Sequence, residues 1–277
     1  MIKRKVKNLE LPVIGMGSAG TYDVEKPEEI EVRKKILDNC VTYGTNFVDT
    51  SPMYKRAEQV IGITIEGKRD KFLLATKVWC SGRETGIKQM NRSFELMKTD
   101  HIEVMQIHNL IDWRTHLPVL EEMKAEGKID LIGLSHYSPT ALAEMAEIMR
   151  TGRIDTIQIS YNVMEREVEK EILPLAESKG IGVIVMRPVG HGILIDRLER
   201  QPDLTPLREY GIETWGQALM AWLISDTRVS TLIPATTKPE RVKENSKAGE
   251  RVLPKEAREY VLREAQRCLK PGKYTMG

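Results

Sequence analysis

The chain has 277 residues, of which 41% are hydrophobic, and its 42 lysines and arginines nearly balance 40 aspartates and glutamates. This is the composition of a globular protein, and a formal net charge of +2 gives no reason to expect nucleic acid or an acidic membrane as a partner. The three cysteines are widely separated without a CxxC pair, and no apolar run approaches the ~20 residues that cross a bilayer. We therefore expect a cytoplasmic protein with neither a disulfide framework nor a cysteine zinc site.

Short apolar runs recur along the whole chain. Each has four to eight residues and is rich in Val, Ile or Leu, as is typical of strands that are buried on both faces of a parallel sheet. The predicted strands are 13–16, 46–49, 72–79, 102–108, 131–135, 156–160, 182–186 and 230–234.

Amphipathic segments with recognisable ends separate these runs. The first begins at Pro27, which suits the first turn of a helix, and ends at Gly44. A later one has Ser138 as its N-cap and stops at Gly152. Another begins at Thr237–Glu240, a capping-box pattern with proline in the first turn. The alternation of runs and segments predicts repeated β/α units.

The spacing of the strand ends predicts the architecture. Successive ends lie 23 to 31 residues apart, the length of a β/α unit with short loops, at Asp49, Lys77, His108, Ser135, Gln158 and Met186. The next step, to Ile233, is 47 residues long and places an insertion at 191–211. Eight such units in a chain not far above ~250 residues predict a (β/α)8 TIM barrel that forms a single domain over residues 1–277.

A glycine motif near the N-terminus competes with this interpretation. Gly15, Gly17 and Gly20 match GxGxxG, the fingerprint of a dinucleotide-binding Rossmann fold. That fold needs a helix that begins inside the motif, whereas the first convincing helix begins only near Pro27. We therefore interpret these glycines as a flexible loop that leaves the first strand.

Four chemically suitable side chains follow consecutive predicted strands. Asp49, Lys77 and His108 lie at strand ends, and Tyr54 lies in the loop after Asp49. Each taken singly is better explained as a cap, a solvated strand end, a packed ring or a core histidine. The carboxyl ends of barrel strands share one pocket, however, so four such residues together predict a catalytic site.

Acid–base chemistry explains why these residue types would meet. A free tyrosine titrates near pH ~10, too high for proton exchange near neutrality. We expect the Lys77 ammonium to lower the pKa of Tyr54, Asp49 to hold Lys77 charged, and His108 to orient a carbonyl oxygen. The four residues include no hydride source, so a cofactor has to supply reducing power if the reaction is a reduction.

These segments resemble the aldo-keto reductase family. The tetrad segments are FVDTSPMY at 47–54, ATKVW at 75–79 and MQIH at 105–108. The resemblance continues in the family's order through 133–135, 158–162, 188–190, 233–234 and 244–245. It implies a (β/α)8 barrel, reduction of a small-molecule carbonyl substrate by NADPH, with NADH as an alternative, and no metal.

The resemblance also implies roles for individual residues. Tyr54 would be the proton donor in reduction, tuned by Lys77 and Asp49, while His108 and Trp79 would contact the substrate. Ordinary packing explains Trp79 equally well. The implied cofactor-binding residues are Gly17, Ser18, Asp49, Ser135, His136, Gln158, Met186, Arg187, Pro188, Thr236, Lys238, Arg241, Glu244 and Asn245.

The sequence around the last of these residues suits a phosphate independently of the resemblance. Lys238 and Arg241 stand at a helix N-terminus, where free amides and the helix dipole favour an anion such as a 2′-phosphate. An exposed basic turn is the alternative, which the nearby match at Glu244 and Asn245 makes weaker.

Three departures from the family pattern affect the cofactor residues. His136 replaces a frequent asparagine, and Met186 replaces an aromatic residue that stacks on nicotinamide. Arg187, next in the chain, is placed to reach either the pyrophosphate or the substrate pocket. Ala235–Thr236 replaces a frequent Lys-Ser pair, which leaves phosphate recognition to Lys238 and Arg241.

Two other classes of protein remain as alternatives. A cofactor-binding regulatory subunit, like the channel-associated β subunits that resemble this family, could keep the tetrad with little turnover. A barrel isomerase or lyase would leave Lys238, Arg241 and Asn245 unexplained. The oligomeric state cannot be inferred from these patterns.

Overall fold

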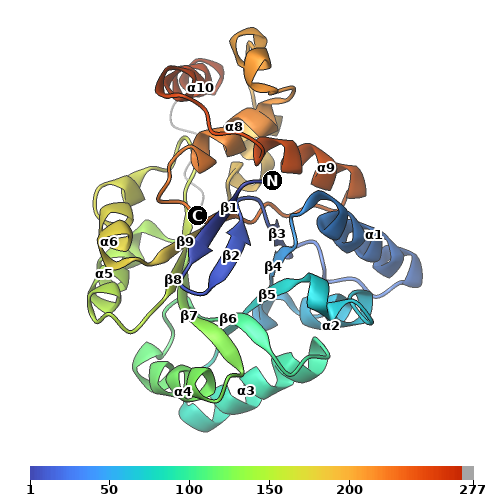
Figure 1. Ribbon diagram of the computed structural model, residues 1–277, viewed down its shortest axis with the longest axis vertical. Coiled ribbons are helices and arrows are strands. Elements are labelled where there is room, and N and C mark those ends of the chain that lie inside the picture. The colour runs from blue at the N-terminus through green and yellow to red at the C-terminus, as the bar shows by residue number, and fades with distance from the viewer. Residues whose placement is uncertain (270–277) are drawn as a thin grey trace.

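Eight parallel strands follow one another around a nearly closed barrel, in chain order, so the predicted (β/α)8 fold is confirmed (Figure 1). The computed structural model describes residues 1–269. The strands are β3 (Met16–Gly17), β4 (Phe47–Asp49), β5 (Leu73–Val78), β6 (Ile102–His108), β7 (Ile129–His136), β8 (Thr156–Ser160), β9 (Gly182–Met186) and β10 (Thr231–Leu232).

The barrel closes between β10 and β3 through single bridges instead of a continuous ladder. Parallel bridges join Ile14 to Leu232 and Gly17 to Ala235. The approach is so close that a Cβ atom on Gly17 would lie 2.6 Å from the carbonyl oxygen of Ile233. Gly15 is equally confined, with its added Cβ 2.7 Å from the carbonyl oxygen of Phe47. The prediction of a flexible loop was therefore wrong for these two glycines, which fit the seam because they have no side chain.

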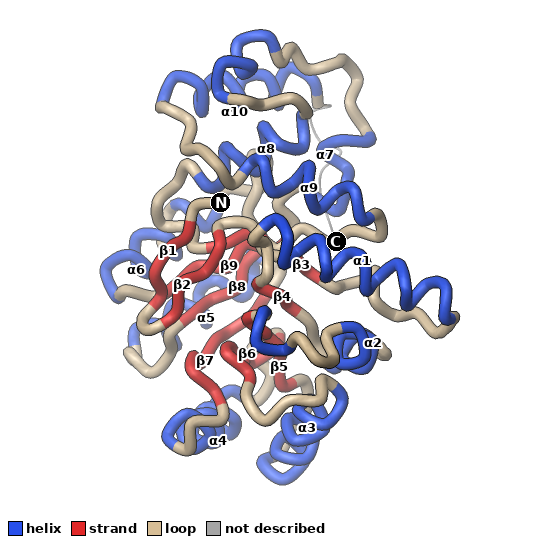
Figure 2. The backbone as a smooth tube through the Cα atoms, turned by 45° about the vertical axis from the view of Figure 1, so that its right-hand side comes forward, coloured by secondary structure: helices blue, strands red, loops and turns tan. Residues whose placement is uncertain are grey.

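Helices surround the strands, as Figure 2 shows in a second view. They are α1 (Pro27–Tyr43), α2 (Ala57–Thr64), α3 (Arg83–Leu96), α4 (Trp113–Ala125), α5 (Leu142–Arg150), α6 (Ile172–Lys179), α7 (Ile193–Asp196), α8 (Trp215–Ile224), α9 (Pro239–Ala248) and α10 (Lys255–Cys268). In the described residues 1–269, no helix combines the length and the apolar character needed to cross a membrane.

Most of the predicted helix ends are confirmed, and one is not. Pro27 opens α1, and Gly44 follows its last turn with a left-handed φ of 70°. Ser138 accepts a hydrogen bond at the start of a short 3-10 turn that leads into α5. The capping box expected at Thr237–Glu240 was wrong, because α9 starts later, after Lys238, without a side-chain cap. A capping box does occur at Thr214, before α8.

The predicted insertion lies between β9 and α8. It contains α7 and a 3-10 helix at Thr205–Tyr210, and it packs against α10. The backbone N–H of Asp203 donates to Glu264 Oε1 at 2.6 Å, and the Tyr260 hydroxyl donates to the Asp203 carbonyl at 2.9 Å. The insertion and α10 together project from the barrel at the top of Figure 1.

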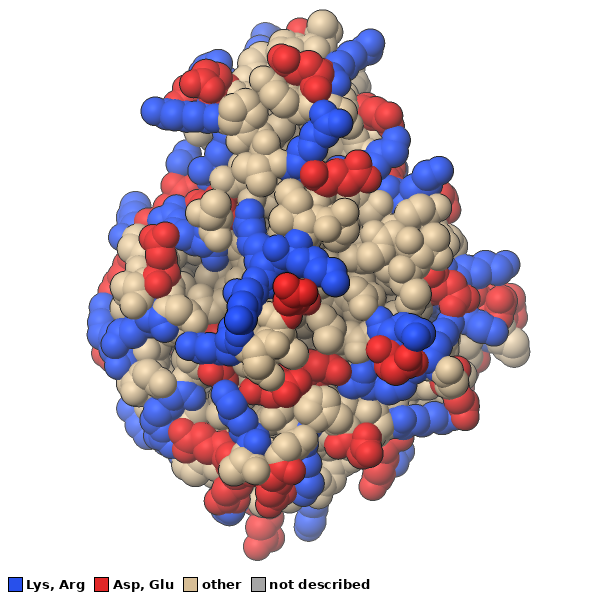
Figure 3. Space-filling view, viewed as in Figure 1, with Lys and Arg blue, Asp and Glu red and all other residues tan. Residues whose placement is uncertain are grey.

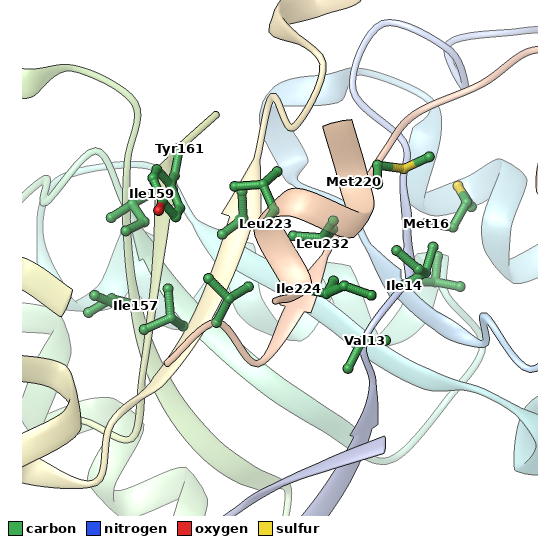
Figure 4. Packing of buried hydrophobic residues seen from close by; sticks show 14 of the residues in the cluster. Val13, Ile14, Met16, Ile157, Ile159, Tyr161, Met220, Leu223, Ile224 and Leu232 are labelled. Carbon is green, nitrogen blue, oxygen red and sulfur yellow. The ribbon is translucent and has the colours of Figure 1, made fainter. Parts of the chain in front are cut away.

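Helix α8 covers the seam of the barrel. All ten of its residues are buried, so it packs against the protein around its whole circumference instead of on one face. Figure 4 shows side chains of α8 beside residues of the neighbouring strands, with labels on Met220, Leu223, Ile224, Leu232, Ile14 and Val13. This packing supports the closure between β3 and β10, where single bridges replace a continuous ladder.

A β-hairpin that the sequence patterns did not reveal closes the N-terminal end of the barrel. Its antiparallel strands are β1 (Lys3–Val6) and β2 (Leu9–Pro12), which lie across the front of Figure 1. Val6 and Leu11 are buried and form an apolar cluster with Phe47, Ala75, Val104, Leu131, Ile184 and Ile233 inside the barrel. The outer side of the hairpin is basic, as Figure 3 shows.

This burial predicts that the hairpin contributes to stability. Leu11 is fully buried, so Leu11→Ala should lower the free energy of unfolding by about 2–5 kcal/mol in chemical denaturation. The neighbouring Glu10 is exposed, and Glu10→Ala serves as a control that should change stability by at most about 0.5 kcal/mol. Equal stability of the two variants would show that the hairpin does not support the barrel.

Candidate active site

The carboxyl ends of the strands bring the four residues of the predicted tetrad together. Asp49 ends β4, Lys77 is the penultimate residue of β5, and His108 ends β6. Tyr54 ends a short 3-10 helix, Pro52–Tyr54, that directly follows β4. A cavity of about 450 Å³ is lined by Asp49, Tyr54 and His108, and Lys77 lies buried beside them. The barrel topology therefore assembles these side chains at one place.

Lys77 and Asp49 form a buried ion pair at the base of this cavity. Lys77 Nζ donates to both carboxylate oxygens of Asp49 at 2.8 Å and to the carbonyl oxygen of Thr50 at 2.7 Å. The amides of Gln106 and Gln158 also donate to Asp49, at 3.0 and 3.4 Å. Burial lowers the pKa of Lys77 and raises that of Asp49, and their contact opposes both changes. Because every ammonium hydrogen has an acceptor, the hydrogen bonds satisfy the ionised form of the pair.

Tyr54 differs from the expectation in the direction of its pKa. Burial raises this pKa, the negative charge of Asp49 raises it further, and Arg187 partly opposes the change. The predicted lowering by Lys77 was wrong for this structure, because the Lys77 charge is directed to Asp49 and the phenol itself is removed from water. The Nζ atom of Lys77 lies 5.6 Å from the centre of the Tyr54 ring. The hydroxyl is therefore protonated at neutral pH, as a proton donor must be.

His108 is held in a neutral form. Burial, followed by the charges of Lys77 and His136, lowers its pKa to about 3. Its Nδ1 lies 2.9 Å from Ser51 Oγ, and that oxygen already accepts the backbone N–H of Met53 at 3.2 Å. With the Ser51 hydroxyl as the donor to Nδ1, the hydrogen of the neutral ring lies on Nε2. A neutral imidazole N–H suits hydrogen bonding to a carbonyl oxygen.

Sequence reasoning missed two residues that support this arrangement. Gln106 precedes His108 by two positions on β6, and the alternation of side chains along a strand places both inside the barrel. That alternation was a usable signal for Gln106. Ser51 is a fully buried residue of the same segment as Asp49 and Tyr54, but its contact with β6 depends on the tertiary fold.

Several of the predicted cofactor residues line the same cavity. Ser135 Oγ and Gln158 Oε1 are buried there and have no hydrogen-bond partner among the described residues. A primary carboxamide has the hydrogens and the acceptor oxygen that these two atoms lack, so the residues present fit a nicotinamide. Ser18 is buried outside the lining. The other predicted residues in the lining are Gly17, Met186, Arg187 and Pro188.

Like Ser18, the predicted residues His136 and Trp79 lie outside the lining of this cavity. His136 turns toward its neighbours: its ring stacks on Tyr137 at 5.3 Å and its Nδ1 accepts the backbone N–H of Ser138 at 3.0 Å. Trp79 is 39% exposed, and its ring centre lies 6.5 Å from that of His108. Trp79 is thus near the substrate side without lining the cavity, whereas Tyr137, which sequence reasoning did not select, does line it.

A second cavity of about 390 Å³ adjoins the first, and both are lined by Val189, His191, Gly192, Pro234 and Ala235. The N-terminal end of α9 borders it, and it is lined by the remaining predicted residues, Thr236, Lys238, Arg241, Glu244 and Asn245. An elongated ligand can therefore extend from the tetrad to this helix end.

The charged residues of the second cavity differ in whether they have protein partners. One oxygen of Glu244 accepts the Thr214 hydroxyl at 2.9 Å, and the other pairs with the Arg241 guanidinium. Lys238 is exposed, and its backbone N–H donates to Thr236 Oγ1 at 3.1 Å. Glu244 therefore contacts Thr214 and positions Arg241, while the Lys238 ammonium makes no ion pair within residues 1–269.

Comparison with known proteins identifies the family. The aldo/keto reductase family model matches residues 13–262, so the chain belongs to that family of oxidoreductases. The uncharacterized oxidoreductase YqkF of Bacillus subtilis is 28% identical, over 90% of the chain and 91% of that protein. The NADH-specific methylglyoxal reductase of Escherichia coli is 25% identical, over 84% and 86% respectively. The structure of an aldo-keto reductase from Klebsiella pneumoniae in complex with NADPH has a TM-score of 0.82 at 26% identity, and the match covers 95% of each chain.

The electrostatics of His108 predict its titration. Its ring NMR signals should stay constant between about pH 8 and pH 5, because its pKa is lowered to about 3. The unfolded chain binds a proton at this histidine near pH ~6.5, so the folded state should lose stability as the pH falls from there toward about 3.

His101 provides an internal control for this experiment. Its hydrogen bonds to Asp130 and to the Gly127 carbonyl outweigh its burial and raise its pKa. We expect the His101 signals to shift within the same pH range. A midpoint for His108 near that of His101 would contradict the neutral form described above.

Proposed function

We propose that the protein is an NADPH-dependent reductase that converts aldehydes or ketones to alcohols. The observation that supports this most strongly is the shared cavity. A protonated Tyr54 hydroxyl and a neutral His108 face it together with the unpartnered Ser135 and Gln158 atoms, so a carbonyl and a carboxamide have partners side by side.

The cofactor would lie along the two adjoining cavities. When bound, NADPH supplies the hydride that the protein lacks. Ser135 and Gln158 would hold its carboxamide, and Lys238 and Arg241 would hold its 2′-phosphate at the start of α9. Met186, which lines the first cavity, would contact the nicotinamide face through an unbranched apolar side chain.

The tetrad residues would then have distinct roles in the reduction. His108 would donate its Nε2 hydrogen to the carbonyl oxygen and fix its position. As negative charge develops on that oxygen, the Tyr54 hydroxyl would transfer its proton to it. Asp49 would keep the Lys77 ammonium beneath Tyr54, and this positive charge would stabilise the phenolate that remains.

Removing one oxygen tests the role of Tyr54. Tyr54→Phe should lower kcat for aldehyde reduction by at least about 100-fold, because the proton donor is lost, while the Kd for NADPH stays unchanged. Tyr43→Phe removes the same atom at the end of α1, away from both cavities, and should retain full activity. Activity and NADPH binding would be followed by NADPH absorbance and by fluorescence titration.

Two results would contradict the proposal. Retention of most activity by Tyr54→Phe would exclude Tyr54 as the proton donor. A wild-type protein that binds NADPH but reduces a panel of small aldehydes no further than a single turnover would favour the regulatory-subunit alternative.

The choice between NADPH and NADH depends on two cations. Replacing Lys238 and Arg241 with Ala should raise the Kd for NADPH at least about 10-fold more than that for NADH, because only NADPH carries the 2′-phosphate. Fluorescence titration with both cofactors measures this difference. The similarity to an NADH-specific enzyme makes the measurement informative.

A matched control removes one lysine and one arginine in or near the same helix but outside both cavities. Lys243 and Arg251 are exposed and line neither cavity, so Lys243→Ala with Arg251→Ala should leave both Kd values unchanged. Equal weakening of NADPH and NADH by the Lys238 and Arg241 substitutions would remove the phosphate role.

A further inference from the structure

Arg187 places a positive charge in the wall of the tetrad cavity. It follows β9 and lines the cavity together with Tyr54 and His108. Within residues 1–269, its guanidinium makes no ion pair with a carboxylate. Its Cζ atom lies over the Tyr137 ring, 4.8 Å from the ring centre.

The backbone and the aromatic ring hold this cation in place. The Arg187 backbone is left-handed, with a φ of 56°, and its carbonyl oxygen accepts hydrogen bonds from Gly190 at 2.9 Å and from Asn162 at 3.3 Å. Tyr137 in turn stacks on His136. A guanidinium that stacks on a ring keeps its N–H edge free, so Arg187 is fixed while its hydrogen-bond donors stay available.

No other charge in the lining cancels that of Arg187. Asp49 is paired with Lys77, and it is the one carboxylate among the described residues that line the cavity. His108 is neutral, and burial together with Arg187 also lowers the pKa of His191, the other histidine in the lining. Among the described residues of the lining, Arg187 is therefore the one charge without an opposite partner. The Glu165 carboxylate lies outside the lining, near enough for Arg187 to oppose the rise of its pKa on burial.

Arg187 lies at the tetrad end of the two adjoining cavities, away from the cations at the start of α9. Arg187 and Tyr137 line the cavity of the tetrad, and neither lines the adjoining cavity that holds Lys238 and Arg241. Arg187 also lies near enough to Tyr54 to lower the pKa of its hydroxyl. An anion beside Arg187 would thus share the cavity with the reacting carbonyl.

We propose that Arg187 binds a carboxylate on the substrate, so that the preferred substrates are aldehydes or ketones that also carry a carboxylate. This inference rests on the proposed carbonyl reduction. The planar guanidinium matches the two oxygens of a carboxylate, and Tyr137 supports its plane. The pyrophosphate of the cofactor is the other anion that Arg187 could bind, and the experiment separates the two.

A matched pair of substrates tests the inference. 4-Carboxybenzaldehyde and 4-formylbenzamide have nearly the same size and differ in charge. The wild-type protein should reduce the carboxylate with a kcat/KM at least about 10-fold higher. Arg187→Gln should abolish this preference, whereas Arg187→Lys should keep part of it.

Arg114 offers a control of the same kind. Its guanidinium lies 4.3 Å from the centre of the Trp113 ring, and the residue is exposed outside both cavities. Arg114→Gln removes a stacked guanidinium and should leave the preference intact. Tyr137→Leu, which removes the supporting ring, should reduce the preference without removing the charge.

Binding measurements distinguish failure of this inference from failure of the proposed function. Calorimetric titration of the NADP-loaded protein with 4-(hydroxymethyl)benzoate and its amide should show tighter binding of the carboxylate, lost in Arg187→Gln. This result does not require turnover. If neither aldehyde is reduced, the proposed function fails, and the titration still decides the role of Arg187.

Two outcomes would overturn the inference. One is equal kcat/KM and equal binding for the carboxylate and the amide in the wild-type protein. The other is a raised Kd for NADPH in Arg187→Gln, with equal losses for both substrates, which would assign Arg187 to the pyrophosphate.

Discussion

The site depends on the burial of one ion pair, that of Lys77 and Asp49. Two charges inside a barrel are costly unless each has a full set of partners, and here Thr50, Gln106 and Gln158 supply them. The three strands that bear Asp49, Lys77 and Gln106 are neighbours in the sheet, so their register fixes the pair. The same contacts hold the Lys77 ammonium 5.6 Å from the centre of the Tyr54 ring, while burial and the charge of Asp49 keep the phenol protonated.

Much of the fold could be predicted because a parallel barrel repeats one local pattern. Buried strands give apolar runs, and the regular distance between their ends indicates how many units there are. The hairpin escaped detection because its exposed lysines interrupt the apolar positions, and its burial becomes visible only when Val6 and Leu11 lie inside the closed barrel. The seam glycines escaped for a similar reason, because the close approach of Gly17 to Ile233 joins the two ends of the sheet.

In the candidate site, too, local patterns predicted which residues lie at strand ends, whereas contacts between distant segments could not be predicted. Strand ends could be found in the sequence, and with them the positions of Asp49, Lys77 and His108. The direction of the Tyr54 pKa could not, because it depends on how burial and Asp49 outweigh nearby cations. The side-chain direction of His136 was also hidden, since the ring turns to Ser138 and Tyr137 instead of the cavity. Contacts between elements, such as Ser51 with His108, follow from the packing of the loop after β4 on β6.

The hairpin across the N-terminal end of the barrel limits how ligands can reach the site. Its buried side chains fill the interior at that end, so the barrel is blocked there. Whatever reaches Tyr54 has to come and leave by the mouth formed at the carboxyl ends of the strands. A cofactor and a substrate that bind there would share this one entrance, and each would block the entry and release of the other while it is bound.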